Sequence, residues 1–115
     1  MEVSELEARE RNLELVAQLE AGGSLQEGPV ADAFRAVLRH HFLRGRLLAE
    51  VYEDAALPAK VDEQGVPVRS SSQPAIMALM LEQLQCWPGQ AVLEIGAGTG
   101  YNVALLWHLV TPGGW

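Results

Sequence analysis

The stretch that decides the fold is VLEIGAGTGYN, residues 92–102. An apolar run precedes three glycines at alternate positions, and the residues after them have the pattern of a helix. Glycines at such a turn permit positive φ and let a ligand approach the backbone, and free N–H groups of the following helix point toward that ligand. The stretch predicts a buried strand over 91–95, a glycine turn, and a helix over 101–110.

The spacing of the glycines bears on the kind of cofactor. Gly96, Gly98 and Gly100 form G-x-G-x-G, whereas the dinucleotide fingerprint needs a glycine where Tyr101 stands. A lone turn of this kind is about as often structural as functional. Glu94 favours a function, because a carboxylate in an apolar strand is unfavourable unless a cation or a donor pairs with it. S-adenosylmethionine, a sulfonium amino acid without phosphate, suits this arrangement better than a dinucleotide.

Composition narrows the function classes. The 115 residues are 49% hydrophobic and 20% charged, with a formal net charge of -7. The eight Lys and Arg residues are scattered, which argues against a nucleic-acid or anionic-membrane surface. The longest apolar run is AIMALML at 75–81, far short of the ~18 residues of a membrane span. Cys86 is the only cysteine, so no internal disulfide forms, and a cytoplasmic protein is expected.

The rest of the chain has mostly helical patterns. We expect helices over 4–21, 29–42, 47–52 and 75–85, and a small hairpin around 62–65. Ser4 and Glu7 fit a capping box at the first helix. The residues expected to face inward are Leu6, Leu13, Val16 and Leu19 in the first helix, Val30, Phe34, Val37 and Leu38 in the second, and Ile76, Leu79, Met80 and Leu84 in the fourth.

Four segments, in order, resemble the protein-L-isoaspartate O-methyltransferase family: AFRAVLRHHFL, VYEDAALP, SSSQPAIMALMLEQL and VLEIGAGTGYN. The last is similar to motif I of class I S-adenosylmethionine-dependent methyltransferases, and the likeness covers roughly residues 30–111. It implies an α/β, Rossmann-like fold in truncated form, with a helical N-terminal region before the first strand, the glycine loop and the next helix. We expect an N-terminal helix and linker over 1–28 and the N-terminal portion of an incomplete methyltransferase domain over 29–115.

The resemblance also implies roles for individual residues. Ser72, two residues before Pro74, matches the family's active-site serine and would orient the acceptor carboxylate. A capping role for Ser72, at the helix that starts near Pro74, is the alternative. The residues implied to bind S-adenosylmethionine are Ser70, Ser71, Gln73, Glu94, Gly96, Ala97, Gly98 and Gly100.

The implied reaction is methyl transfer to the isoaspartyl or aspartyl carboxylate of a protein or peptide. Neither nucleic acid nor a membrane is an expected partner, whereas the bare edges of the 91–95 strand favour self-association. An acid for the ribose is expected ~20 residues beyond the glycines, at the end of the chain, so we expect a fragment that can be inactive alone. A peptide aspartate methyltransferase and a non-catalytic interaction module remain alternatives. Tyr101 and Glu94 disfavour a nicotinamide-binding fragment.

No metal site is expected from the sequence. His40, His41 and His108 show no ligand-like spacing to acidic partners. They are expected at the surface or half-buried, as packing residues.

Overall fold

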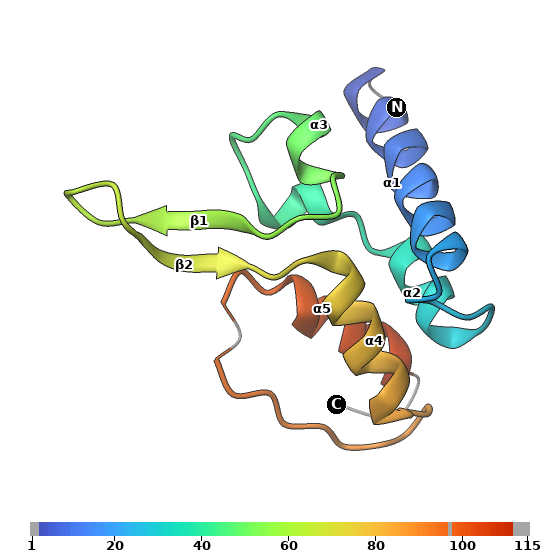
Figure 1. Cartoon of the computed structure of the whole chain (residues 1–115). Helices are drawn as coiled ribbons and strands as arrows, with labels where there is room; N and C mark the ends of the chain where they lie inside the picture. Colours follow the sequence, from blue (N-terminus) through green and yellow to red (C-terminus); the bar gives the residue numbers. More distant parts are fainter. Residues whose placement is uncertain (1–2, 97, 112–115) are drawn as a thin grey trace.

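The computed structural model describes residues 3–96 and 98–111, which form a mostly helical molecule with one small sheet (Figure 1). In chain order the elements are α1 (Val3–Ala21), α2 (Pro29–Ala36), the 3-10 helix η1 (Arg39–Phe42), α3 (Leu48–Val51), β1 (Leu57–Val61), β2 (Pro67–Ser71), α4 (Pro74–Leu84) and α5 (Tyr101–Val110). Within these ranges no helix is long and apolar enough to cross a membrane. These bounds confirm the helices predicted over 4–21, 47–52, 75–85 and 101–110, whereas the helix predicted over 29–42 divides into α2 and η1.

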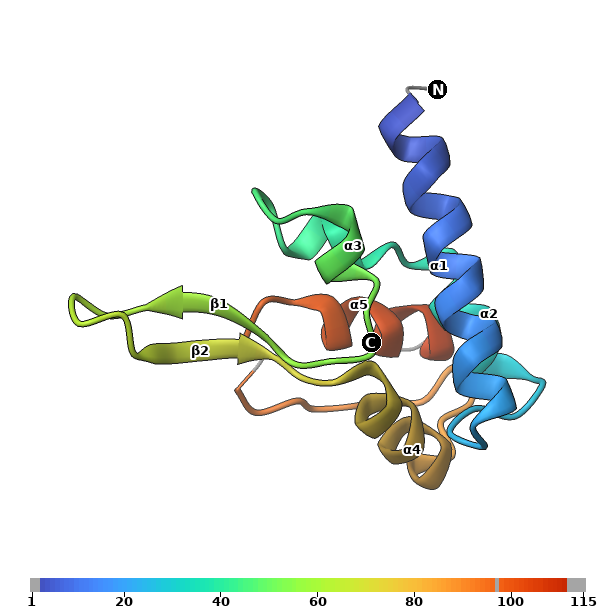
Figure 2. The ribbon, with the colours of Figure 1, turned by 45° about the horizontal axis from the view of Figure 1, so that its top comes forward.

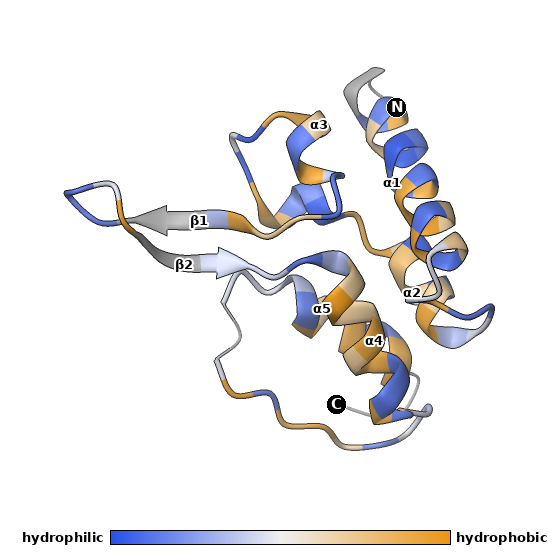
Figure 3. Ribbon diagram, in the orientation of Figure 1, coloured by the Kyte–Doolittle hydropathy of each residue, from blue (hydrophilic) through white to orange (hydrophobic). Residues whose placement is uncertain are grey.

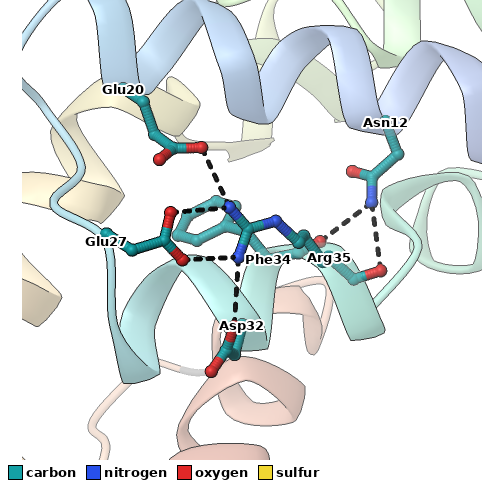
Figure 4. Close-up of polar contacts among 6 residues, drawn as sticks. All are labelled: Asn12, Glu20, Glu27, Asp32, Phe34 and Arg35. Atoms are coloured by element: carbon teal, nitrogen blue, oxygen red, sulfur yellow. Dashed lines mark hydrogen bonds and ion pairs between the residues drawn. The ribbon is translucent and has the colours of Figure 1, made fainter.

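Polar contacts join α1 to α2 (Figure 4). The Asn12 amide on α1 is buried and donates hydrogen bonds to the carbonyls of Phe34, at 2.9 Å, and Arg35, at 3.4 Å. These carbonyls lie at the end of α2, where a helix lacks partners of its own. The Arg35 guanidinium in turn forms ion pairs with three carboxylates, those of Glu20, Glu27 and Asp32. The two helices are thus joined by the hydrogen bonds of the Asn12 side chain to the α2 backbone and by the ion pair of Arg35 with Glu20.

The hydrophobic core lies where α1, α2, α4 and α5 meet, as the two ribbon views show (Figures 1 and 2). Its fully buried side chains include Leu15, Val16 and Leu19 of α1, Phe34 of α2, and Tyr101 and Leu105 of α5. The Phe34 and Tyr101 rings pack edge to face, with centroids 6.2 Å apart. Because α2 packs against both α1 and α5, it joins the N-terminal helix to the helix that follows the glycine turn.

The predicted inward face is half right in α1 and wrong in α4. In α1, Leu6 and Leu13 are exposed, and Ala8, Asn12 and Leu15 are buried beside Val16 and Leu19. In α4, the four residues expected inside are exposed, and the helix buries Pro74, Met77, Ala78 and Leu81 instead. The predicted capping box is also wrong, because Ser4 lies inside α1 and Glu7 pairs with Arg11. Figure 3 shows that α4 is apolar around most of its circumference.

The predicted hairpin is confirmed. Strands β1 and β2 pair antiparallel, with Leu57 opposite Ser71. Asp62 Oδ1 accepts hydrogen bonds from the backbone N–H groups of Gln64, at 3.0 Å, and Val66, at 2.9 Å, which closes the turn. The hairpin delivers the chain to Ser70 and Ser71 at the end of β2, directly before α4 (Figure 1).

The predicted buried strand over 91–95 is not formed. These residues run as an irregular segment, and Leu93 and Ile95 are 86% and 90% exposed. A strand requires a neighbour for its backbone donors and acceptors, and among the described residues the sheet consists of β1 and β2 alone. The α/β class therefore appears here as its helices and the glycine turn, without a parallel sheet.

Candidate functional site

A cavity of about 450 Å³ lies between the end of β2, α4 and the glycine turn. Its volume falls in the range of small-molecule sites. One wall is polar, and the other is made by apolar side chains of α4. The lining residues used below are Ser70, Ser71, Ser72, Ile76, Met80, Leu84, Glu94, Gly96, Gly98, Thr99, Tyr101 and Asn102.

The glycine turn has the predicted backbone conformation. Gly96, Gly98 and Gly100 have φ of 74°, 60° and 93°, a region in which other residues are strained. A Cβ on Gly98 would lie 3.9 Å from the carbonyl oxygen of Ser70, so the turn approaches the end of β2 closely. A Cβ on Gly100 would lie 3.6 Å from the Phe42 ring. These separations are ordinary van der Waals contacts, so the positive φ values, more than lack of space, favour glycine at the three positions.

Glu94 is the one carboxylate among the described residues that line the cavity. Its Oε2 accepts a hydrogen bond of 2.7 Å from the Asn102 amide, in the first turn of α5. Its Oε1 is buried and has no hydrogen-bond partner within the described part of the chain. A buried carboxylate oxygen without a donor is unfavourable, which suits a ligand that brings an ammonium group or another donor. Asn102 was missed from the sequence, although it closes the quoted stretch.

The serine segment is positioned by Arg39, which is fully buried. Its guanidinium donates to the carbonyl of Ser72 at 3.0 Å and lies 3.4 Å from Ser71 Oγ. It also donates to the carbonyl of Val51 at 2.9 Å. Burial lowers the pKa of the Arg39 guanidinium, but an arginine keeps its proton in proteins. Arg39 was missed from the sequence, because its partners lie 12 to 33 residues further along the chain.

The free N–H of the α4 N-terminus is satisfied by Asp54 and not by Ser72. Asp54 Oδ1 accepts from the backbone N–H of Ala75 at 2.8 Å. The N-cap residue, Gln73, makes no capping hydrogen bond with its side chain, and its amide instead lies 3.4 Å from the Asp54 carbonyl. Ser72 is exposed and lines the cavity. The geometry therefore leaves the Ser72 hydroxyl to the cavity.

The structure brings together six of the nine predicted site residues: Ser70, Ser71, Ser72, Glu94, Gly96 and Gly98 line the cavity. Gln73 turns to Asp54, and Gly100 packs on Phe42. Ala97 lies outside the described residues.

Tyr101 closes the inner end of the cavity. Its ring is buried and packs against Phe34 and Phe42, and the Arg39 guanidinium carbon lies 5.9 Å from the ring centroid. Burial raises the pKa of the Tyr101 hydroxyl well above its usual range. The hydroxyl thus stays neutral at physiological pH and acts in packing.

The combination of walls indicates the kind of molecule that fits. Glu94 Oε1 supplies an acceptor for a cationic group, and the glycine turn leaves backbone within reach. Ile76, Met80 and Leu84 supply an apolar wall on the opposite side. Ser70 and Ser72, which are both exposed, line the cavity as well. A compact ligand with a cationic polar end and an apolar body meets a partner at each of these walls.

His40 and His41 form a second cluster with Glu5, an acidic partner that the sequence spacing did not indicate. Glu5 Oε1 lies 2.6 Å from His40 Nε2 and 3.1 Å from His41 Nε2. Glu5 is 35 residues away from His40 in sequence, so spacing could not indicate the contact. The hydrogen bonds of both rings lower the pKa of the Glu5 carboxyl.

Comparison with known proteins shows the family of the chain. The family model described as protein-L-isoaspartate(D-aspartate) O-methyltransferase matches residues 10–115. The protein-L-isoaspartate O-methyltransferase of Methylorubrum extorquens is 45% identical over 100 residues, covering 87% of this chain and 40% of that protein. The one from Aeropyrum pernix is 39% identical over 106 residues, covering 92% and 38%. The chain thus spans about two fifths of the length of these relatives.

Solved structures give the same result. A protein-L-isoaspartate O-methyltransferase superposes with a TM-score of 0.77 at 36% identity, covering 90% of this chain and 32% of that one. A second match comes from Plasmodium falciparum, a protein described as a putative protein-L-isoaspartate O-methyltransferase in complex with S-adenosyl-L-homocysteine. Its TM-score is 0.65 over 81% of this chain, and at 21% identity the likeness concerns the fold alone.

Proposed function

The chain belongs to the protein-L-isoaspartate(D-aspartate) O-methyltransferase family, and from this we propose that it forms the N-terminal part of an S-adenosylmethionine-dependent carboxyl O-methyltransferase. The acceptor we propose is an isoaspartyl or aspartyl carboxylate in a protein or peptide. The observation that carries the proposal is Glu94, which lines a cavity shared by the glycine turn and the serine segment and whose buried Oε1 has no hydrogen-bond partner among the described residues.

Glu94 is the residue we propose for the amino group of the cofactor. Asn102 holds Oε2, so Oε1 is oriented before any ligand arrives. Gly96 and Gly98 leave room for the amino-acid end of the cofactor beside their backbone. Ser70, Ser71 and Ala97, which lies outside the described residues, complete the proposed set, with Gln73 and Gly100 as supports outside the cavity. S-adenosylmethionine supplies a methyl group on a sulfonium, a good leaving group.

Ser72 is the residue we propose for the acceptor carboxylate. One carboxylate oxygen would accept a hydrogen bond from the Ser72 hydroxyl while the other attacks the methyl carbon. No proton has to move for this step, so the task of the protein is to align the two groups and exclude water. Arg39 supports this role, because it holds the Ser72 carbonyl and leaves the hydroxyl free.

The proposed assignment extends to the organisation of the chain. Residues 29–115 would be the N-terminal portion of the methyltransferase domain, and 1–28 an N-terminal helix and linker that packs on it. The helix α1 shares the hydrophobic core and packs on α2, so its deletion would expose the side of the core that α2 and α5 leave to it. The single cysteine agrees with the cytoplasm as the proposed compartment.

A chimera tests the proposal. Residues of this chain would replace the matching 100-residue segment of the Methylorubrum extorquens relative, which is 45% identical there. We expect methyl transfer from S-adenosylmethionine to a peptide that contains isoaspartate. The same peptide with ordinary aspartate separates the two acceptors, because equal transfer to both would favour a peptide aspartate methyltransferase. A folded chimera that methylates neither peptide would contradict the proposal.

A non-catalytic interaction module is the second candidate, and one observation favours it. The side of the cavity formed by α4 and residues 93–95 exposes large apolar side chains: Ile76, Leu79, Met80, Leu84, Leu93 and Ile95. Contiguous apolar surface of this kind marks an interaction site. Sedimentation of the chain with and without the change Met80→Glu would test self-association. A monomer in both cases would remove this candidate in its self-pairing form.

A further inference from the structure

The cluster of Glu5, His40 and His41 lies outside the proposed methyltransferase cavity and serves no role in it. Glu5 comes from the first turns of α1, whereas both histidines belong to η1. One carboxylate oxygen and two ring nitrogens, one from each residue, lie within 4.8 Å of one another. We propose that these three side chains form a site for a divalent transition metal of the zinc class.

The donor types support this assignment. Two imidazole nitrogens and one carboxylate oxygen form a set that proteins use for Zn²⁺ when a fourth position stays open to water. Imidazole ligands suit zinc, copper, iron and nickel, whereas Mg²⁺ and Ca²⁺ prefer oxygen ligands. The set therefore selects against the two abundant hard cations.

The geometry requires little movement. A tetrahedral ion with bonds of about 2.0–2.2 Å holds its ligand atoms about 3.3 Å apart. Here Glu5 Oε1 lies 3.1 Å from His41 Nε2 and 2.6 Å from His40 Nε2. The required separation thus differs by less than about an ångström at either contact. A single carboxylate oxygen faces both rings, whose centroids are 4.2 Å apart, and one cation among the three atoms would satisfy them together.

Tyr52 orients one of the ligands. Its hydroxyl lies 2.7 Å from His40 Nδ1, which leaves Nε2 directed at Glu5. A metal-bound histidine almost always makes such a second contact through its other ring nitrogen, and that contact fixes the ring and its tautomer. Tyr52 is buried, so it provides a rigid support.

The surroundings leave an open coordination position. A cavity of about 370 Å³ adjoins the cluster and is also lined by Leu43, Arg44, Arg46 and Leu48. The two arginines oppose a cation, and the hydrogen bond from the Arg46 guanidinium to the neutral carbonyl of Pro58 does not offset that charge. Glu5 is the carboxylate among the residues that line this cavity, and a single anionic ligand with two neutral ones gives a site of moderate affinity.

Calorimetric titration of the untagged chain with ZnCl₂ tests the proposal, with MgCl₂ as the comparison metal. We expect one Zn²⁺ per chain, and no Mg²⁺ binding in the same range. His41→Ala and Glu5→Gln should each weaken Zn²⁺ binding by at least ~10-fold, as loss of even an outer contact does in known sites. The matched control is His108→Ala, which removes an exposed histidine on α5.

A spectrum of the Co²⁺-loaded wild-type chain gives a readout that does not depend on a variant's folding. Co²⁺ in a four- or five-coordinate site absorbs strongly in the visible range, whereas a hexahydrated or loosely bound ion absorbs weakly. Strong absorption that Zn²⁺ abolishes would support the site. Weak absorption, unchanged Zn²⁺ affinity in both ligand variants, or a loss of affinity in His108→Ala would overturn it.

Discussion

The guanidinium of Arg39 donates a 3.0 Å hydrogen bond to the carbonyl of Ser72, from a position that is fully buried. The same group donates to the carbonyls of Val51, Glu53 and Ala55. These hydrogen bonds therefore fix residues 51–55 and Ser72 to η1, the helix that carries Arg39. The position of the proposed acceptor-binding serine depends on a residue that has no access to the acceptor.

Arg39→Met should destabilise the fold strongly. The change leaves several buried carbonyls without donors, and breaking a buried charged network typically reduces the free energy of unfolding by about 3–5 kcal/mol. Urea unfolding followed by circular dichroism measures the loss. Arg9→Met on the exposed side of α1 is the control and should change it by less than ~0.5 kcal/mol. A similar small effect at Arg39 would contradict the structural role.

The parts of the fold that the sequence could predict are those with local signals. Gly28-Pro29 marks the start of α2, and the alternating glycines mark the turn at 96–100. The buried face of α4 could not be predicted, because PAIMALML is apolar on all sides and has no polar face that would mark the exposed side. The strand at 91–95 was wrong because its pattern requires a neighbouring strand, which the described residues do not provide.

The candidate site, like the fold, could be predicted only where its signals are local in the sequence. Serines and glycines that are close in sequence to a recognisable turn were found, and six of the nine meet in one cavity. Arg39, Asp54 and Glu5 were missed because each acts on partners 12 to 36 residues away, which no spacing rule connects. Long-range polar contacts follow from the packing of helices and not from local pattern.

Alkaline pH should unfold the chain through its two tyrosines, which are the only ones it has. Burial raises the pKa of Tyr52 to about 12 and that of Tyr101 further, whereas an unfolded tyrosine titrates near pH 10. Below about pH 10 both states keep these protons, so their contribution to stability is fully present. As pH rises from there toward the folded pKa, the unfolded state loses protons that the folded state retains, and stability falls.

Ultraviolet absorbance of tyrosinate, recorded with circular dichroism, measures this effect. We expect no tyrosinate near pH 10 to 11 until the helices unfold, and both signals should then change together. Tyr101→Phe leaves Tyr52 as the only reporter, and it should alter stability by less than about 1 kcal/mol, because the Tyr101 hydroxyl has no partner among the described residues. Titration of either tyrosine near pH 10 in a fully helical chain would contradict its burial.

The chain should bind S-adenosylhomocysteine weakly. Glu94 and the glycine turn offer partners for the amino-acid end, but no second carboxylate among the described residues lines the cavity for the ribose hydroxyls. NMR titration should shift the amides of Glu94, Gly96 and Gly98, and Glu94→Gln should remove most of the effect. Glu10→Gln, on the exposed face of α1, is the matched control. Tight, stoichiometric binding would show that the cavity suffices without further contacts.

Ser72→Ala should separate a role in methyl transfer from a role in capping α4. Asp54 already satisfies the N–H of Ala75, so the Ser72 change should leave the melting temperature unaltered. Asp54→Ala is the matched variant and should reduce the free energy of unfolding by about 0.5–2 kcal/mol, as the loss of a helix cap does.

In the active chimera, Ser72→Ala should raise the barrier to methyl transfer by on the order of 1–3 kcal/mol, because the acceptor carboxylate loses a hydrogen bond that is tightest as the methyl group moves. That corresponds to roughly a 5- to 150-fold lower rate, with little change in the affinity for S-adenosylhomocysteine. Initial rate, cofactor affinity and melting temperature are measured on one preparation. An unchanged rate beside a lowered melting temperature would make Ser72 a structural residue of the α4 N-terminus and remove it from the proposed site.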